Sequence, residues 1–380
     1  MKFFDILIIG GGLVGNSLAC ALAQQGLKTG IVETRQPSTS TDKRSIVLSY
    51  SSHTILQTLG LWSALTADAN PIAKVQVKQR GYFGAARFSA NEFNMAALGY
   101  VIPANVLTNA LQQSVLDQPN ITIIAPADFQ QFEVTTDHVQ VKLKIAANEQ
   151  LIMTRLIIAA DGSNSPLRQM QHIPTTHNDY EQTAIITTVT TSQDNQNTAF
   201  ECLTPTGPLA LLPRKKNECG VVWTVAKQEA EAVLTLSDQD FLMRLQESFG
   251  YGLGKFLTIA DRSAYPLQLI LAQQQVQPGL VLVGNAAHTL HPLAGQGFNL
   301  ALRDIAALAE VLVVANKEGK KIGDLAVLQK YEDWRAQEQK NIARFSDKTV
   351  KALAKQQLWM ELSICLGLFA LGLLPVARKQ

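Results

Sequence analysis

The sequence predicts an α/β protein in which a parallel-sheet domain is interleaved with an antiparallel β-sheet domain and followed by a helical C-terminus. Apolar runs are typical of parallel strands covered on both faces, and they occur at 5–9, 121–124, 156–160 and 280–283, with a further strand expected at 29–33. Glycine-broken short strands over 72–102 and a Thr/Val-rich stretch over 183–225 indicate the antiparallel part. Helices are expected over 13–25, 105–116 and 299–315.

This order of elements means that the chain visits the parallel-sheet domain three times. A chain of 380 residues is also too long for one small core. We therefore assign 1–71, 102–180 and 270–345 to the parallel-sheet domain. Residues 72–101 and 181–269 form the antiparallel domain, and 346–380 form a helical, apolar C-terminal segment.

Composition excludes several classes of protein. The net charge is +2 and no dense Lys/Arg block occurs, so nucleic acid is not expected as a partner. The four cysteines are far apart without a C-x-x-C pair, which argues against a zinc site or disulfide framework and favours a cytoplasmic location. The apolar N-terminus runs straight into a glycine cluster and is expected to be the first strand, not a signal peptide.

The first motif, GGGLVG, follows the first strand in G-x-G-x-x-G register and opens a helix. Gly10 suits a tight turn, Gly12 lets a pyrophosphate approach the backbone, and Gly15 lets helix and strand pack closely. Free N–H groups at the helix start, around Leu13 and Val14, favour a bound anion. Glu33 ends the second strand, where a carboxylate can accept hydrogen bonds from a ribose. The pattern predicts a dinucleotide site but does not separate NAD from FAD.

The second motif is a strand over 156–160 that ends in Asp161-Gly162 and continues through small polar residues to Arg168 in a helix. Such a turn can present backbone N–H groups and a carboxylate to a polar cofactor. The alternative is a strand-to-helix junction in which Asp161 binds local amides.

The third motif, GNAAHTLHPLAGQGFNL, follows the strand at 280–283. The strand delivers Asn285, and a loop from Pro292 through Gly295, Gln296 and Gly297 then opens a helix. This loop can lie flat against an aromatic ring system, and the helix N-terminus can stabilise negative charge at its edge. A reduced flavin carries such a charge.

With these three motifs in this order, essentially the whole chain resembles the class A FAD-dependent aromatic hydroxylases, which share the para-hydroxybenzoate hydroxylase fold. The runs DKRSIVLS (42–49) and GNAAHTLHPLAGQGFNLALRD (284–304) resemble the ubiquinone-biosynthesis branch, of the 2-polyprenyl-6-methoxyphenol hydroxylase type. The resemblance implies a Rossmann-like FAD-binding domain and a substrate domain. It also implies FAD as cofactor, NAD(P)H as a transient reductant, O2, and a polyprenylated phenol as substrate.

The resemblance also implies roles for single residues. The motif glycines would hold the FAD pyrophosphate, Glu33 the adenosine ribose, and Arg44 the phosphate or ribityl region. Asp161 and Gly162 match a motif associated with FAD and pyridine-nucleotide use. Asn285 stands where most of the class has Asp against the ribityl chain, a departure shared with the ubiquinone branch. The remaining residues, Pro292, Gly295, Gln296 and Gly297, would line the isoalloxazine ring.

Several interpretations stay open. His288 and His291 are candidates for acid/base catalysis, and the alternative is that they order the loop through hydrogen bonds. Arg303 and Asp304 are expected to form a structural pair. Two other functions fit the same fold: a reductase or monooxygenase acting on a different lipophilic substrate, and a non-catalytic flavoprotein scaffold in a complex of ubiquinone-biosynthesis proteins.

The segment 362–377 is almost wholly apolar but shorter than the roughly 20 residues that span a bilayer. Two expectations remain open. The segment packs on the protein or on a partner subunit, or it makes a peripheral contact with the inner membrane.

Overall fold

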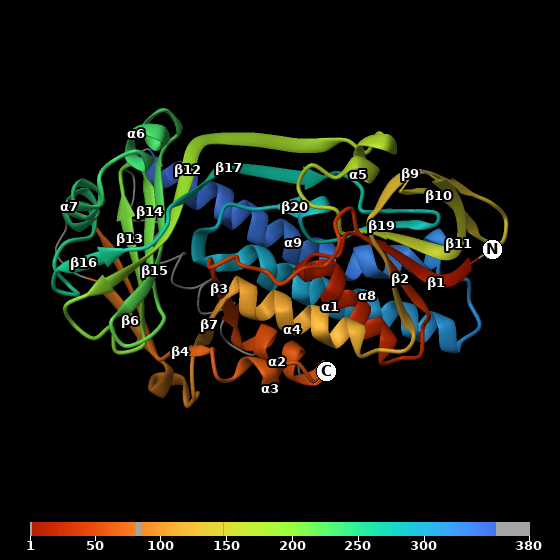
Figure 1. The fold of residues 1–380 in the computed structure, drawn as a ribbon, viewed down its shortest axis with the longest axis horizontal. Coiled ribbons are helices and arrows are strands. Elements are labelled where there is room, and N and C mark those ends of the chain that lie inside the picture. Colours follow the sequence, from red (N-terminus) through yellow and green to blue (C-terminus); the bar gives the residue numbers. More distant parts are fainter. Residues whose placement is uncertain (1, 81–84, 147, 355–380) are drawn as a thin grey trace.

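The computed structural model describes residues 2–80, 85–146 and 148–354, as two sheet-based bodies side by side (Figure 1). The larger body is built on an eight-stranded mixed sheet, and the smaller one on a nine-stranded sheet. A small three-stranded sheet lies between them, made of β3 (Ser45–Ser49), β7 (Gly99–Pro103) and β4 (Asn70–Ile72).

The mixed sheet has the order β18-β19-β11-β1-β2-β8, with β10 and β9 continuing from β11. Strands β19, β11, β1, β2 and β8 pair in parallel, whereas β18 pairs with β19, and β10 with β11, in antiparallel fashion. The strands are β1 (Lys2–Ile9), β2 (Thr29–Val32), β8 (Ile121–Ile124), β9 (Ala127–Val134), β10 (Val139–Ile145), β11 (Asn148–Ala159), β18 (Val276–Gln277) and β19 (Leu280–Leu282).

Both faces of this sheet are buried, which explains its continuous apolar runs. In β1, Ile6 and Ile8 belong to the core beneath the long helices, whereas Leu7 and Ile9 belong to the core on the opposite face. The helices are α1 (Leu13–Ala23), α2 (Tyr50–Thr58), α3 (Trp62–Leu65), α4 (Ala104–Leu116), α5 (Pro166–Met170), α8 (Gln296–Lys317) and α9 (Leu325–Ala354).

The second sheet has the order β20-β17-β12-β15-β14-β13-β5-β6, with β16 beside β12. Its strands are β5 (Lys74–Gln79), β6 (Ala85–Ser89), β12 (Thr175–Thr191), β13 (Thr198–Thr204), β14 (Gly207–Pro213), β15 (Glu218–Ala226), β16 (Phe256–Ile259), β17 (Ser263–Ala272) and β20 (His288–Thr289). Its outer face is covered by α6 (Ala230–Leu234) and α7 (Asp238–Phe249) (Figure 1). Its inner face packs against the small sheet.

Some boundaries differ from those expected. Helix α8 begins at Gln296, not 299, because Gly295 takes the left-handed conformation at the N-cap and turns the loop directly into the helix. Strand β11 begins at Asn148, not 156, because it forms a hairpin with β10 before it enters the parallel sheet. Strands β12 and β17 run along one another over their lengths and extend from the smaller body toward the larger (Figure 1). The domain division at 72–101 and 181–269 stays a prediction.

Among the described residues, no helix is long and apolar enough to cross a membrane. The apolar segment 362–377, for which packing or a membrane contact was expected, lies outside the described residues.

Candidate functional site

The three motifs meet at one edge of the mixed sheet. Strands β1, β11 and β19 are parallel neighbours, so the turns that follow them emerge side by side (Figure 1). Backbone hydrogen bonds also link the three strand ends, because Val283 N donates to Ala159 O and Ala160 N donates to Ile9 O. In open α/β sheets this carboxyl edge is where ligands bind.

The glycine turn is packed too tightly for any side chain at two of its positions. A Cβ on Gly10 would lie 2.4 Å from Ala160 O, and the φ of Gly10 is +109°. A Cβ on Gly15 would lie 1.9 Å from Gly10 O. Gly12 is different: it is exposed at the N-cap of α1, and nothing lies within 4 Å of its Cβ position. Two glycines therefore shape the turn, while the third leaves its outer side open at a helix N-terminus.

Glu33 follows β2 and turns its carboxylate back to the glycine turn. Its Oε2 accepts a hydrogen bond from Gly11 N at 2.7 Å, and its Oε1 accepts from Thr34 Oγ1 and Arg35 N. A hollow opens beside this carboxylate, between β2 and α4. Its lining comprises Gly11, Asn16, Ile31, Glu33, Arg35, Gln36, Pro37, Ser38, Gln112, Val115, Leu116 and Ile123.

The Asp161-Gly162 turn supplies a carboxylate with spare hydrogen-bonding capacity. Asp161 Oδ2 accepts from Leu167 N at 3.2 Å, whereas the buried Oδ1 has no hydrogen-bond partner among the described residues. Burial raises the pKa of this carboxyl above its ordinary value. The φ of Gly162 is +90°, and the space around its Cβ position is open.

Arg168 connects the second motif to the third. Its guanidinium donates to Ala286 O at 2.8 Å and to Ser163 O at 2.7 Å, and the residue is buried. These bonds satisfy carbonyls of two separate turns with one rigid donor group. Arg168 therefore holds the two turns in one arrangement.

The third motif begins with a tight turn at Gly284–Ala286, where Gly284 faces Val14 of α1 and a Cβ would lie 2.9 Å from Val14 Cγ2. Asn285 projects an exposed side chain from this turn. An exposed amide at this edge can hydrogen-bond a ligand hydroxyl.

His288 lies in a buried charged cluster. Its Nε2 lies 2.6 Å from Asp304 Oδ2, and Asp304 Oδ1 accepts from Arg335 Nε, also at 2.6 Å. Burial alone would raise the pKa of Asp304, but the hydrogen bonds and charges of His288 and Arg335 together lower it below its ordinary value. The cluster joins β20, α8 and α9.

The expected pairing of Arg303 with Asp304 is wrong. Consecutive residues of a helix project about 100° apart, so their side chains do not face each other. Asp304 points inward to His288 and Arg335, while Arg303 Nε lies 2.6 Å from Glu338 Oε1 on α9.

His291 is fully buried at the start of the loop, and its Nδ1 accepts from Leu293 N at 3.2 Å. Its ring packs edge-on against Tyr180 with a centroid distance of 5.4 Å. Burial lowers the pKa of His291 to about 4. Both histidines thus have structural contacts that order the loop, and their acid/base role stays a prediction.

The loop that follows packs on the small sheet. Pro292 is exposed, and Gly295 faces Val47, where a Cβ would lie 2.9 Å from Val47 Cβ. Gln296 and Gly297 form the first turn of the 22-residue helix α8, whose N-terminal N–H groups face the loop. A small, largely apolar hollow lies behind the loop, lined by Val47, Leu48, Ser49, Ile72, Val75, Leu98, Gly99, Ala294, Gln296 and Asn299.

Asn299 was not singled out from the sequence, although it holds this loop in place. Its Nδ2 donates to Val47 O and Gly295 O, and its Oδ1 accepts from Ser49 N and Ser52 Oγ. A buried amide with four partners fixes its surroundings firmly. No signal in a single sequence distinguishes it from an ordinary polar helix residue.

Arg44 lies apart from the glycine turn, at the junction of the two bodies. Its guanidinium pairs with Asp42 and lies 4.9 Å from the ring centroid of Tyr265 in the second sheet. The structure therefore brings Arg44 together with the second sheet, and its expected contact with a phosphate or ribityl chain stays a prediction.

These features fit an extended dinucleotide carrying a flavin. The hollow beside Glu33 suits an adenosine, and the open helix N-terminus at Gly12 suits a pyrophosphate. Asn285 and the unpartnered Asp161 Oδ1 offer polar groups in between. The loop before α8 offers a flat backbone surface and a positive helix end for the ring system.

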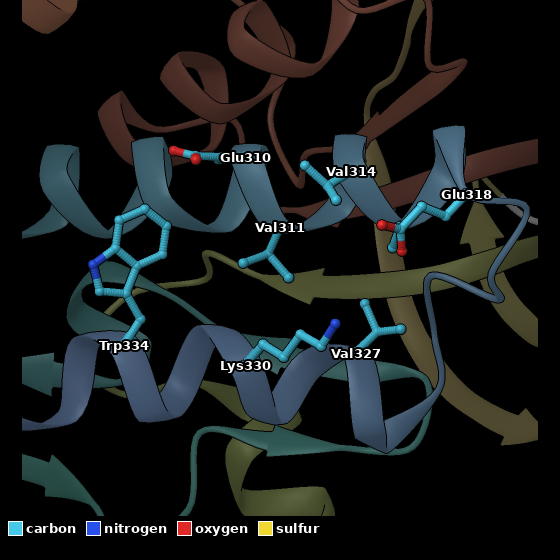
Figure 2. Close-up of a pocket in the computed structure, with 8 residues that line it drawn as sticks. Glu310, Val311, Val314, Glu318, Val327, Lys330 and Trp334 are labelled. Carbon is cyan, nitrogen blue, oxygen red and sulfur yellow. The ribbon is translucent and has the colours of Figure 1, made fainter. Parts of the chain in front are cut away.

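A third hollow lies on the surface between α8 and α9 (Figure 2). Glu310, Val311, Val314, Ala315, Glu318, Val327, Lys330 and Trp334 line it. It is about 20 Å or more along α8 from the loop, given a rise of roughly 1.5 Å per residue. It is therefore not part of the site formed by the three motifs.

Comparison with known proteins agrees with this geometry. The model of a family described as "FAD binding domain" matches residues 4–346. The chain is 33% identical to the ubiquinone hydroxylase UbiL of Rhodospirillum rubrum, over 97% of this chain and 86% of that protein. It is also 33% identical to the 3-demethoxyubiquinol 3-hydroxylase of Escherichia coli, over 86% of this chain and 84% of that protein.

Among solved structures, the fold is similar to that of PqsL, a probable FAD-dependent monooxygenase from Pseudomonas aeruginosa. The TM-score is 0.81 at 18% sequence identity, covering 96% of this chain and all of that one. At this identity the likeness concerns the fold alone.

Proposed function

Because this chain belongs to the FAD-binding-domain family, we propose that it is an FAD-dependent monooxygenase that hydroxylates a polyprenylated phenol in ubiquinone biosynthesis. NAD(P)H would be the transient reductant and O2 the source of the oxygen atom. The observation that carries the proposal is the 33% identity, over most of the chain, to a ubiquinone hydroxylase and to a 3-demethoxyubiquinol 3-hydroxylase.

The proposed roles of the cofactor residues follow their positions at the sheet edge. The chemistry that bound FAD supplies is electron transfer from NAD(P)H and activation of O2. The α1 N-terminus would hold the pyrophosphate, Glu33 the ribose, and Asp161 and Asn285 the polar chain toward the ring. The full proposed set is Gly10, Gly12, Leu13, Val14, Gly15, Glu33, Arg44, Asp161, Gly162, Asn285, Pro292, Gly295, Gln296 and Gly297.

The chain itself would contribute position and exclusion of water. The apolar hollow between the loop and β3, β5 and β7 adjoins the surface proposed for the flavin ring. An electron-rich ring seated beside that surface would be held close to the activated oxygen and away from solvent. Apolar side chains such as Val47, Ile72 and Val75 suit the prenyl chain of such a phenol better than a charged metabolite.

The test is product analysis with the FAD-loaded protein, NAD(P)H, a short-chain prenylated methoxyphenol and isotopically labelled O2. We expect phenol-stimulated NAD(P)H oxidation and one labelled oxygen atom in the product by mass spectrometry. Reduction of the substrate without label would point to a reductase. Neither oxidation nor product with any phenol offered would point to a scaffold flavoprotein and overturn the proposal.

We further propose that 362–377, outside the described residues, makes the peripheral membrane contact that a poorly soluble substrate requires. Co-sedimentation of the full chain, but not of a chain ending at residue 354, with anionic lipid vesicles would support this. Equal recovery of both proteins in the supernatant would contradict it.

A further inference from the structure

The inner face of the second sheet carries one row of partly exposed side chains. Glu201 on β13 pairs with Ala210 on β14, Ala210 pairs with Val222 on β15, and Val222 pairs with Ile186 on β12. All four residues have intermediate exposure. We call these four residues the open row.

On β13, β14 and β15 the rows on either side of the open row are covered. Side chains alternate between the two faces of a strand, so the same-face neighbours of each residue lie two positions away. On β13, β14 and β15 these neighbours are all buried: Ala199, Leu203, Pro208, Leu212, Gly220 and Thr224. On these three strands the open row is therefore an accessible strip between covered rows, and on β12 the partly exposed surface continues to Thr188.

This face is the one turned toward the proposed flavin loop. Phe200 and Cys202, adjacent to Glu201, belong to the outer core under α7. Ala199 and Leu203 belong to the inner core, against which Val47 packs. Val47 in turn touches Gly295 of the loop. Figure 1 shows the same order, with α7 outside the sheet and β3 and β7 on the side of the larger body.

Glu201 is the only titratable member of the open row, and its other three members are apolar. Desolvation raises the pKa of Glu201 to about 7, and no other cause contributes. The charged groups of surrounding elements have other partners or are exposed. Arg44 pairs with Asp42, Arg214 donates to Thr188, Lys78 donates to Phe249 O and Arg87 to Gln76, while Arg80 and Glu92 are exposed.

We infer that the open row seats the phenol ring and that Glu201 is the catalytic residue that receives the proton of its hydroxyl. This inference rests on the proposed function. The phenol O–H bond breaks, its proton forms a new O–H bond with the Glu201 carboxylate, and the electron pair stays on the phenol oxygen. The negative charge moves from the carboxylate to the phenol, whose ring becomes richer in electrons where oxygen is added. A proton acceptor in this position typically accelerates reaction by about 10²–10⁴-fold.

The first test compares Glu201→Gln and Glu201→Asp with Glu247→Gln, which removes the same charge from an exposed site on α7. With 2-methoxy-6-prenylphenol, we expect kcat/KM of the wild type to rise about tenfold between pH 6 and pH 8, because the carboxylate must be ionised to accept the proton. E201Q should lose this rise and lower kcat roughly 100-fold or more. E201D should keep part of the pH-dependent rise and part of the wild-type kcat. E247Q should match the wild type in both quantities. An unchanged pH profile and rate in E201Q, with FAD retained, would overturn the inference.

The second test needs no turnover and no variant. The FAD-loaded wild type is titrated with the same phenol and with its methyl ether, and binding is followed by the change in the visible FAD spectrum. At pH 8 we expect the phenol to bind roughly tenfold or more tightly than its methyl ether, and at pH 6 we expect this preference for the phenol to be smaller. Equal binding of phenol and ether at both pH values would overturn the role of Glu201. If the phenol binds more tightly than the ether but no oxygenated product forms, the proposed function is wrong while the role of Glu201 in binding the phenol is retained.

Discussion

Replacement of Asp304 by Asn should destabilise the protein strongly, although the two side chains have nearly the same shape. Asp304 is fully buried and accepts short hydrogen bonds from His288 Nε2 and Arg335 Nε, both at 2.6 Å. An amide offers one acceptor oxygen and turns N–H donors toward the other partner, which is itself a donor. Removing one partner of a buried charge pair costs about 3–5 kcal/mol, because the remaining charge is left uncompensated.

This loss can be measured as a shift of the thermal midpoint. An unfolding entropy of about 2.1 cal/mol/K per residue over the chain gives roughly 0.8 kcal/mol/K, so Tm should fall by about 4–6 °C. The matched control is Asp333→Asn, an exposed carboxylate on the neighbouring helix α9, which should change Tm by about 1 °C or less. A decrease for D304N no larger than that of the control would refute the buried-pair argument.

The pH dependence of the stability tests the buried charge of Asp304 a second time. Because the pKa of Asp304 is lowered in the folded state, its stabilisation is fully present above the ordinary carboxyl pKa near 3.9. It is lost as pH falls through the lower, folded-state value. The Tm difference between wild type and D304N should therefore be constant at neutral pH and shrink below about pH 4.

Three further predictions concern the sheet edge. Gly15→Ala should lower the free energy of unfolding in denaturant by at least about 1–3 kcal/mol, because its Cβ would lie 1.9 Å from Gly10 O. Gly12→Ala, where the space is open, should keep the wild-type free energy of unfolding and only weaken FAD binding. Equal stability of the two variants would contradict the packing argument. Glu33→Ala should weaken FAD binding by roughly 10–100-fold in fluorescence titrations, since it frees Gly11 N–H and removes the carboxylate; unchanged affinity would exclude the ribose-side role. His291, whose pKa is lowered to about 4, should stay neutral above pH 5 in an NMR titration. Because the unfolded chain binds this proton more tightly, the free energy of unfolding should increase from pH 4 to pH 6.5. A titration midpoint of His291 near pH 6.5 would contradict this.

The sequence predicted the parallel sheet well because its signals are local. Each motif is a strand, a turn and a helix start in direct succession, and each strand is apolar because both sheet faces are covered. Parallel strands end at one edge, so the strand-turn-helix order of the motifs is enough to expect the three turns to meet. The roles assigned to their residues are untested and stay predictions.

What the sequence did not reveal depends on partners far along the chain. Asp304 was paired with its neighbour Arg303, whereas its partner Arg335 is on the next helix. Asn299 bonds Ser49, 250 residues away. Glu201 could not be distinguished from other acidic residues in strands. The alternation of side chains along a strand shows that Glu201 and Phe200 lie on opposite faces of the sheet, but it does not show which part of the protein covers the face of Glu201. Such contacts are set by tertiary packing, and one sequence carries no local sign of them.

The spacing between the proposed flavin loop and the proposed substrate sheet is set by β3, which belongs to none of the glycine motifs. Ser45 of this strand packs on Gly220 of β15, where a Cβ would lie 2.2 Å from Ser45 Oγ. Val47 packs on Gly295 of the loop, where a Cβ would lie 2.9 Å away. Asn299 then ties the backbone of β3 to the loop through Val47 O and Gly295 O. One strand therefore touches both the proposed cofactor surface and the proposed substrate surface, at two glycines that admit no side chain. Because oxygen transfer depends on sub-ångström placement of the ring, β3 is as much a part of the site as the residues that bind ligand.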